Sequence, residues 1–65
     1  MRILVNGAWR ETTGADVAAV LEELGFAASV VATAVNGEFV ATGTRAATRL
    51  AEGDRLEVLA PMQGG

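Results

Sequence analysis

Residues 50–65 read Leu-Ala-Glu-Gly-Asp-Arg-Leu-Glu-Val-Leu-Ala-Pro-Met-Gln-Gly-Gly. The Glu-Gly-Asp triplet at 52–54 is typical of a turn, and the alternation of polar and apolar residues over 55–59 predicts a strand. Pro61 ends that strand, because proline cannot donate to a sheet ladder and it holds the preceding residue extended. We therefore expect a last strand that leads directly into a short tail, residues 61–65.

The first and last strands both show the two-residue period that separates a core face from an outer face. Residues 1–6 place Met1, Ile3 and Val5 on one side and Arg2, Leu4 and Asn6 on the other. In the last strand, Leu56 and Val58 are expected to face the core together with Ala60, whereas Arg55, Glu57 and Leu59 face outward.

Two Asn-Gly pairs, Asn6-Gly7 and Asn36-Gly37, predict tight hairpins, because both central residues of a type I′ turn need a positive φ. The first hairpin returns through residues 8–12. The second joins the β-branched run at 30–35 to a short strand at 38–40.

A short helix is predicted between the hairpins. Val17, Val20, Leu21 and Leu24 form one apolar stripe at helical spacing, and Gly25 stands where a helix C′ residue belongs. Asp16 and Thr13 are alternative N-caps. Glu22 and Glu23 are interpreted as a solvated face rather than a catalytic pair. Residues 41–51 lack a clear period and are read as a loop with one helical turn near 46–49, before an inward-facing Leu50.

The order strand, strand, helix, strand, short strand, strand indicates an α+β fold. One helix must cover the apolar face of a mixed sheet of four to five strands, with the first and last strands parallel at its centre. This is the β-grasp, or ubiquitin-like, architecture. We expect residues 1–60 to form the domain and residues 61–65 to form a flexible functional tail.

Composition excludes several classes of function. The chain has 65 residues, a net charge of −3, no cysteine and no histidine. Disulfides, the usual zinc sites and catalysis by cysteine or histidine are therefore excluded. The five arginines are scattered, which argues against nucleic-acid binding. No apolar run has the length of a membrane span, and Met1 leads straight into a strand, so a cytoplasmic protein is expected.

The whole chain resembles the ThiS family of thiamin-biosynthesis sulfur carriers. The resemblance rests on the opening Ile-Leu-Val-Asn-Gly at 3–7, the helix at 17–25, Val35-Asn36-Gly37, and above all the closing stretch at 50–65 quoted above. The less patterned segment at 41–48 departs from the family. Molybdopterin-type carriers of the MoaD family are also similar, but are usually somewhat longer.

The resemblance implies a carrier that has no catalytic or metal-binding residue of its own. The carboxylate of Gly65 would be adenylated by a partner similar to ThiF and the ubiquitin E1 enzymes, which would use ATP and Mg²⁺. A persulfide donor would then convert it to a thiocarboxylate for a ThiG-like thiazole synthase. Two glycines suit this chemistry, because Gly64 leaves the acyl carbon of Gly65 unshielded and the backbone unrestricted. Extended, the tail reaches at most about 16–18 Å.

A partner must also dock on the domain. Leu4 and Leu59 point outward on strands that the fold makes neighbours, rimmed by Arg2, Arg55 and Glu57. With Met62 and Gln63 of the tail, the two leucines form the expected partner-binding surface. Trp9 fits either the core or an extension of this patch.

Three other functions stay open at this point. The chain could supply sulfur for molybdopterin synthesis or tRNA thiolation, act as a ubiquitin-like protein modifier, or serve as an interaction module whose Gly-Gly end is incidental. An independent enzyme is disfavoured, because the sequence offers no nucleophile–base pair, metal cluster or phosphate-binding loop.

Overall fold

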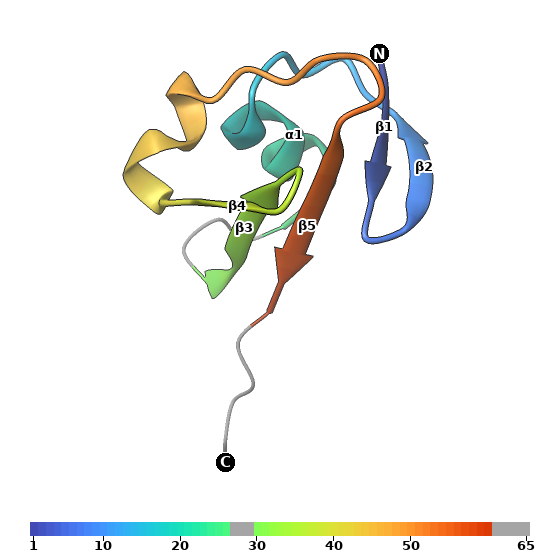
Figure 1. Ribbon diagram of the computed structural model, residues 1–65. Helices are drawn as coiled ribbons and strands as arrows, with labels where there is room; N and C mark the ends of the chain where they lie inside the picture. Colours follow the sequence, from blue (N-terminus) through green and yellow to red (C-terminus); the bar gives the residue numbers. More distant parts are fainter. Residues whose placement is uncertain (27–29, 61–65) are drawn as a thin grey trace.

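The structure, a computed structural model, describes residues 1–26 and 30–60 of the chain (Figure 1). Five strands form one mixed sheet in the order β2-β1-β5-β3-β4. The central strand β5 is parallel to β1 and antiparallel to β3. The strands are β1 Arg2–Val5, β2 Ala8–Glu11, β3 Ala32–Val35, β4 Glu38–Val40 and β5 Arg55–Leu59; the helices are α1 Val17–Glu23 and the 3-10 helix η2 Thr42–Ala47. The predicted β-grasp architecture is confirmed.

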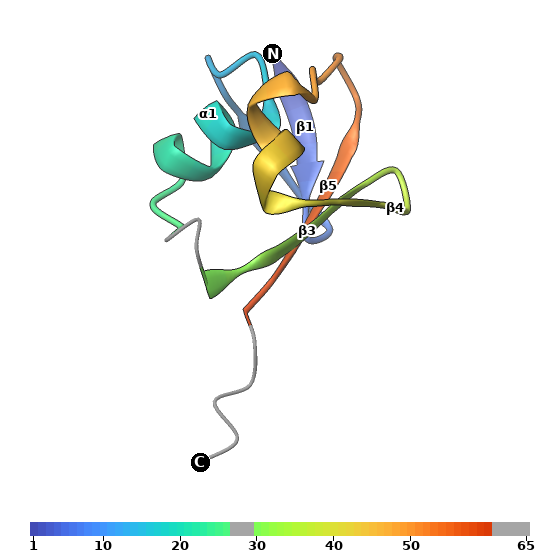
Figure 2. The same cartoon turned by 90° about the vertical axis from the view of Figure 1, so that its left-hand side faces the viewer.

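The core lies between the sheet and α1, which covers one face of the sheet (Figure 2). Ile3 from β1, Leu21 from α1 and Leu56 from β5 are fully buried and meet there. The other buried members of this cluster are Val5, Val17, Val20, Leu50 and Val58. The opposite face of the sheet, which we term the outer face, carries no helix in the described part of the chain.

Both Asn-Gly pairs form the tight turns that the sequence predicts. Asn6 and Gly7 have φ values of 49° and 83°, and Asn36 and Gly37 have 51° and 87°. Asparagine is one of the few residues other than glycine that tolerate this left-handed region. The turns set the registers Leu4↔Trp9 and Ala34↔Phe39, in which directly opposite side chains share a face of the sheet.

The ends of α1 follow capping chemistry. Asp16 is the N-cap, and its side chain accepts a 2.8 Å hydrogen bond from the Ala19 N–H. At the other end, Gly25 has a φ of 84°, and the Phe26 N–H donates to the Leu21 carbonyl at 2.9 Å in a Schellman arrangement. Of the two candidate caps, the structure therefore selects Asp16 over Thr13.

Two expectations for the second half of the chain are wrong. The helical turn predicted at 46–49 is instead η2, which begins four residues earlier. Arg45 on η2 is 3% exposed, and it donates through Nε to Thr33 Oγ1 at 3.2 Å and through a terminal nitrogen to the Val31 carbonyl at 2.5 Å. This buried guanidinium ties η2 to the core side of β3.

The second wrong expectation concerns Ala60. It is exposed rather than core-facing, because β5 has already ended at Leu59.

Glu23 organises the loop that joins β2 to α1. Its carboxylate accepts hydrogen bonds from the Thr12 hydroxyl and from the backbone N–H groups of Thr13, at 3.1 Å, and Gly14, at 3.2 Å. These bonds, the Thr12 hydroxyl first, lower the pKa of Glu23 below its ordinary value of 4.5. Glu23 is solvent-exposed as predicted, and it also serves as an anchor for this loop.

The lowered pKa of Glu23 predicts a pH-dependent stability. Its carboxylate stabilises the folded chain fully above pH 4.5, the ordinary value, and this contribution is lost as the pH falls through the lower folded pKa. We expect Glu23→Gln to be less stable than the parent near neutral pH, and the difference to shrink as the pH falls. Urea unfolding from pH 7 to pH 3 measures it. Glu22→Gln is the control, and an equal pH response in both variants would contradict the assignment.

Candidate functional site

The candidate site begins where β5 ends. On its β3 side, β5 is paired as far as Leu59, which is opposite Ala32. Because the strand is central and paired on both sides, it offers a firm root for the segment that follows. The predicted site residues Met62, Gln63, Gly64 and Gly65 lie outside the described residues.

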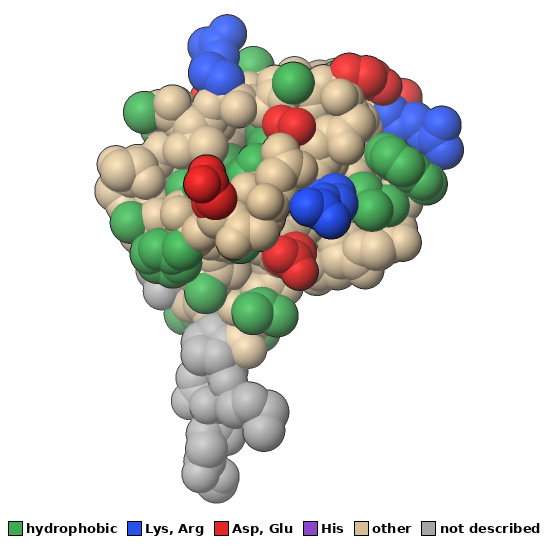
Figure 3. Space-filling model, viewed as in Figure 1, with side chains coloured by type: hydrophobic (Ala, Val, Ile, Leu, Met, Phe, Trp, Pro, Cys, Tyr) green, Lys and Arg blue, Asp and Glu red, His purple; other side chains and the backbone are tan. Residues whose placement is uncertain are grey.

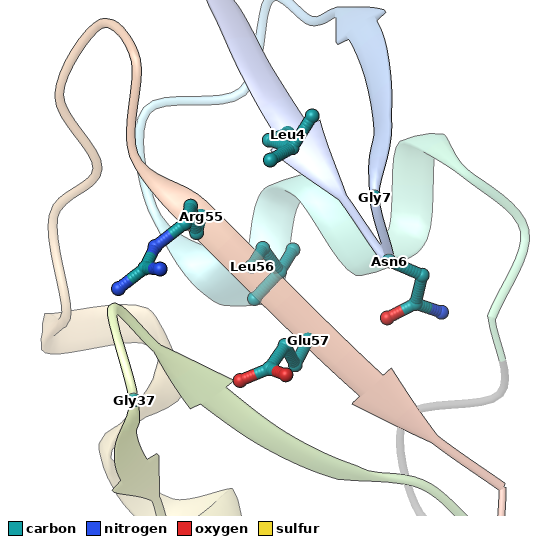
Figure 4. Close-up of a pocket in the computed structure, with 7 residues that line it drawn as sticks. All are labelled: Leu4, Asn6, Gly7, Gly37, Arg55, Leu56 and Glu57. Atoms are coloured by element: carbon teal, nitrogen blue, oxygen red, sulfur yellow. The ribbon is translucent and has the colours of Figure 1, made fainter.

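On the β1 side, the backbone pairing of β5 stops at Val5↔Leu56. Beyond this pair, the side chain of Asn6, which is labelled in Figure 4, forms the hydrogen bonds to β5. Its Oδ1 accepts from the Val58 N–H at 2.8 Å, and its Nδ2 donates to the Val58 carbonyl at 3.0 Å. Sequence analysis assigned Asn6 only to the turn. The turn signal could not reveal this second role, which requires knowing where β5 lies.

Asn36 makes a comparable contact at the beginning of β5. Its Oδ1 accepts from the Arg55 N–H at 3.0 Å, and its Nδ2 donates to the Asp54 carboxylate at 3.1 Å. The two turn asparagines therefore hold the two ends of β5 from opposite sides.

The outer face holds a shallow hollow of about 270 Å³ between β1 and β5 (Figure 4). Leu4 of β1 lies opposite Arg55 of β5, and both line this hollow together with Glu57. Leu4 is half-buried. Trp9, directly opposite Leu4 on β2, is 52% exposed, and the Arg2 guanidinium lies 4.9 Å from the centre of its ring. Trp9 thus extends the outer face and is not a core residue.

A second, smaller hollow of about 130 Å³ lies beside the end of β5. Leu59, which is 68% exposed, lines it together with Ala34 and Phe39. At 74%, Phe39 is the most exposed large apolar side chain among the described residues. Sequence analysis did not single out Phe39. The Asn36-Gly37 turn contained the signal, because a two-residue hairpin loop places residue 39 opposite residue 34.

Leu4 and Leu59 share the outer face but are not side by side. Leu4 is opposite Arg55, and Leu59 is four residues farther along β5, about 13 Å away at the rise of a strand. Hydrophobic side chains accordingly gather in two places, over β1 and β2 and toward the lower left over β3, β4 and the end of β5, with charged side chains between them (Figure 3). The outer face therefore presents two apolar areas rather than one.

The described residues contain no group of three or more acidic side chains positioned to bind a metal ion. Among the helices that the structure describes, none has the length and apolar character needed to cross a membrane.

Comparison with known proteins places these features in a family. The model of the ThiS family matches residues 3–65, which includes all but the first residue of the described sheet, both described helices and the segment after β5. The chain belongs to the ThiS family. No curated protein matches it significantly.

Two solved ThiS-like structures agree with this membership over the full chain. The crystal structure of a thiamine biosynthesis protein, ThiS, from Geobacter metallireducens is 35% identical, covers all of both chains and superposes with a TM-score of 0.84. The solution structure of a thiamine biosynthesis protein from the same organism is also 35% identical. The alignment covers all of this chain and 88% of that protein's chain, with a TM-score of 0.79.

The exposed position of Phe39 in this ThiS-family chain predicts that its side chain is dispensable for folding. We expect Phe39→Ser to change the free energy of unfolding by no more than about 0.5 kcal/mol, as for other surface substitutions. Val40→Ser is the matched control, because the neighbouring side chain is only 7% exposed and should cost roughly 1–3 kcal/mol. Urea denaturation measures both. Equal losses would show that Phe39 packs into the core.

Proposed function

We propose that this chain is a sulfur carrier for the synthesis of the thiazole ring of thiamin. In this proposal the reactive group is the carboxylate of Gly65. An E1-like, ThiF-like enzyme joins it to AMP from ATP with Mg²⁺, and pyrophosphate leaves. The outer sulfur of a persulfide then attacks the acyl carbon and AMP leaves. Cleavage of the sulfur–sulfur bond by a thiol frees the thiocarboxylate, which supplies a ThiG-like thiazole synthase.

The observation that carries the proposal is the family match, because it extends through Gly65 instead of ending with the folded domain. The structures at 35% identity are both of proteins whose stated role is thiamine biosynthesis. Identity at that level over the whole chain supports a shared role and not only a shared fold.

The fold suits a carrier that presents its own end to another enzyme. β5 is the central strand and has partners on both sides, so the chain leaves the domain from a strand that is held along both edges. Adenylation needs a carboxylate placed close to the phosphate that it attacks, and a fixed root limits the conformations that must be lost when the tail enters an active site. The domain itself takes part as co-substrate and does not catalyse a step.

The outer face is the proposed docking surface. Leu59 with Phe39 forms the apolar area nearest the end of β5, and Leu4 with Trp9 forms the farther one. Aromatic side chains are enriched where proteins bind each other, and both areas lie on the sheet face opposite α1. Met62 and Gln63 would contact the partner as the tail enters its channel.

The first test changes the glycine before the reactive end. Gly64→Val should reduce adenylation about a hundredfold, because a branched Cβ crowds the channel and misplaces the carboxylate. The assay is ATP–pyrophosphate exchange catalysed by the ThiF-like enzyme. Ala60→Val is the control, since it places the same side chain at an exposed position before the tail and should be adenylated like the parent.

Mass spectrometry of the intact chain, incubated with the activating enzyme, ATP, Mg²⁺ and a persulfide donor, should show one oxygen exchanged for sulfur at Gly65. An unchanged mass would overturn the proposal, and conjugates to lysine side chains would indicate a protein modifier. Binding to molybdopterin synthase without binding to thiazole synthase would assign the sulfur to the other pathway.

The docking surface has its own test. Leu59→Glu should weaken binding to the ThiF-like enzyme roughly tenfold or more, because it places a charge in an apolar contact. Isothermal titration calorimetry measures the affinity. Ala46→Glu is the control: it makes the same change of charge at an exposed position on η2, which packs near α1. Unaltered affinity of Leu59→Glu would remove the end of β5 from the interface.

A further inference from the structure

On the β1 side of the sheet, the last residues of β5 extend beyond the end of β1. Backbone pairing with β1 stops at Leu56, whose carbonyl accepts from the Asn6 N–H at 3.0 Å. At Asn6 the chain enters the left-handed region and turns away toward β2. Without another partner, the edge of β5 at Val58 would be open on this side, just before the chain leaves the domain.

The carboxamide of Asn6 fills this place. If β1 continued as a parallel strand, the Val58 N–H would donate to the main-chain carbonyl of residue 6. The Val58 carbonyl would accept from the main-chain N–H of residue 8. Oδ1 and Nδ2 of Asn6 supply both groups, at 2.8 Å and 3.0 Å. One side chain thus replaces the two backbone groups that β1 no longer offers after turning, and it continues the ladder by one step.

We propose that Asn6 is a positioning residue for the tail: by completing the β1 side of the ladder at Val58, its carboxamide fixes the direction in which the chain leaves the domain after Ala60. The inference rests on the proposed function, because it matters only if the tail must reach an active site. Looseness at the root of a short tail reduces the fraction of complexes in which the carboxylate is correctly placed.

The position requires asparagine for two reasons at once. The turn needs a residue that tolerates a φ of 49°, and the ladder needs one donor and one acceptor on a short planar group. Glycine satisfies the turn but has no amide, and ionised aspartate satisfies the turn but accepts only. Both substitutions therefore separate the two roles of Asn6.

Asn36 provides a matched comparison within the same strand. It has nearly the same φ, and its carboxamide also forms two hydrogen bonds beside β5. These bonds are to Asp54 and Arg55, where β5 begins. Asn36→Gly removes the same chemical group from an identical Asn-Gly turn, far from the tail. A general loss of stability should affect both variants alike, whereas a positioning role belongs to Asn6 alone.

Amide hydrogen exchange of the isolated chain tests the contact itself. In Asn6→Gly, the Val58 N–H should exchange roughly tenfold faster or more, whereas in Asn36→Gly the Arg55 N–H should do so and Val58 should keep its protection. Asn6→Asp keeps an acceptor for the Val58 N–H but sets a carboxylate oxygen against the Val58 carbonyl, so it should speed exchange at Val58 by a smaller factor, and it serves if the glycine variant fails to fold. Unchanged exchange at Val58 in the folded variants would overturn the proposal.

Kinetics of adenylation by the ThiF-like enzyme test the positioning. With Asn6→Gly, we expect kcat to fall roughly 3- to 30-fold, as for lost hydrogen bonds that act in the reacting complex, and KM to change less than about twofold, because the apolar docking areas are intact. Asn36→Gly should match the parent in both constants. Equal kcat losses in both variants, or none in either, would overturn the role of Asn6. If the parent chain itself is not adenylated, the proposed function fails, and the role of Asn6 in that reaction fails with it.

Discussion

The rest of the fold depends on the pairing of one strand, β5, along both of its edges. Its backbone joins the N-terminal hairpin to the second hairpin, which do not pair with each other in the described sheet. Its inward side chains, Leu56 and Val58, meet α1 in the core. Its outward side chains divide the outer face into two apolar areas. In a domain this small, one well-paired central strand therefore serves as core, sheet connection and origin of the tail.

The elements that could be predicted are those whose signals are local. Each Asn-Gly pair specifies a turn through the φ values of two adjacent residues, and the apolar spacing of α1 with Gly25 after it specifies a helix and its end. The parallel placement of β1 and β5 was expected from the order of the elements, in which a crossover through one helix joins two hairpins into a mixed sheet. These inferences need no knowledge of contacts between distant residues.

What could not be predicted depends on register between distant segments. The carboxamide of Asn6 meets Val58, 52 residues away, and no local pattern marks that contact. Arg45 stands in a segment of small residues with no clear period, so nothing local indicated that its guanidinium would be buried against β3. Leu4 and Leu59 were expected in one shared patch on neighbouring strands, but Leu4 is opposite Arg55, four residues before Leu59, and Phe39 was not singled out. The proposed roles of Gly64 and Gly65 rest on the chemistry of a terminal carboxylate and on the family resemblance, not on register between strands.

The contacts of the two asparagines also bear on the chemical durability of the protein. Asparagine followed by glycine is prone to deamidation, because the unhindered glycine nitrogen attacks the side-chain carbonyl carbon and expels ammonia. In the folded chain, both carboxamides are engaged beside β5, and each must leave its hydrogen bonds before that attack can occur. Deamidation at these turns therefore requires the hydrogen bonds between each asparagine and β5 to open first. A product aspartate at position 6 would set a carboxylate against the Val58 carbonyl, so damage there would loosen the strand that the amide had held.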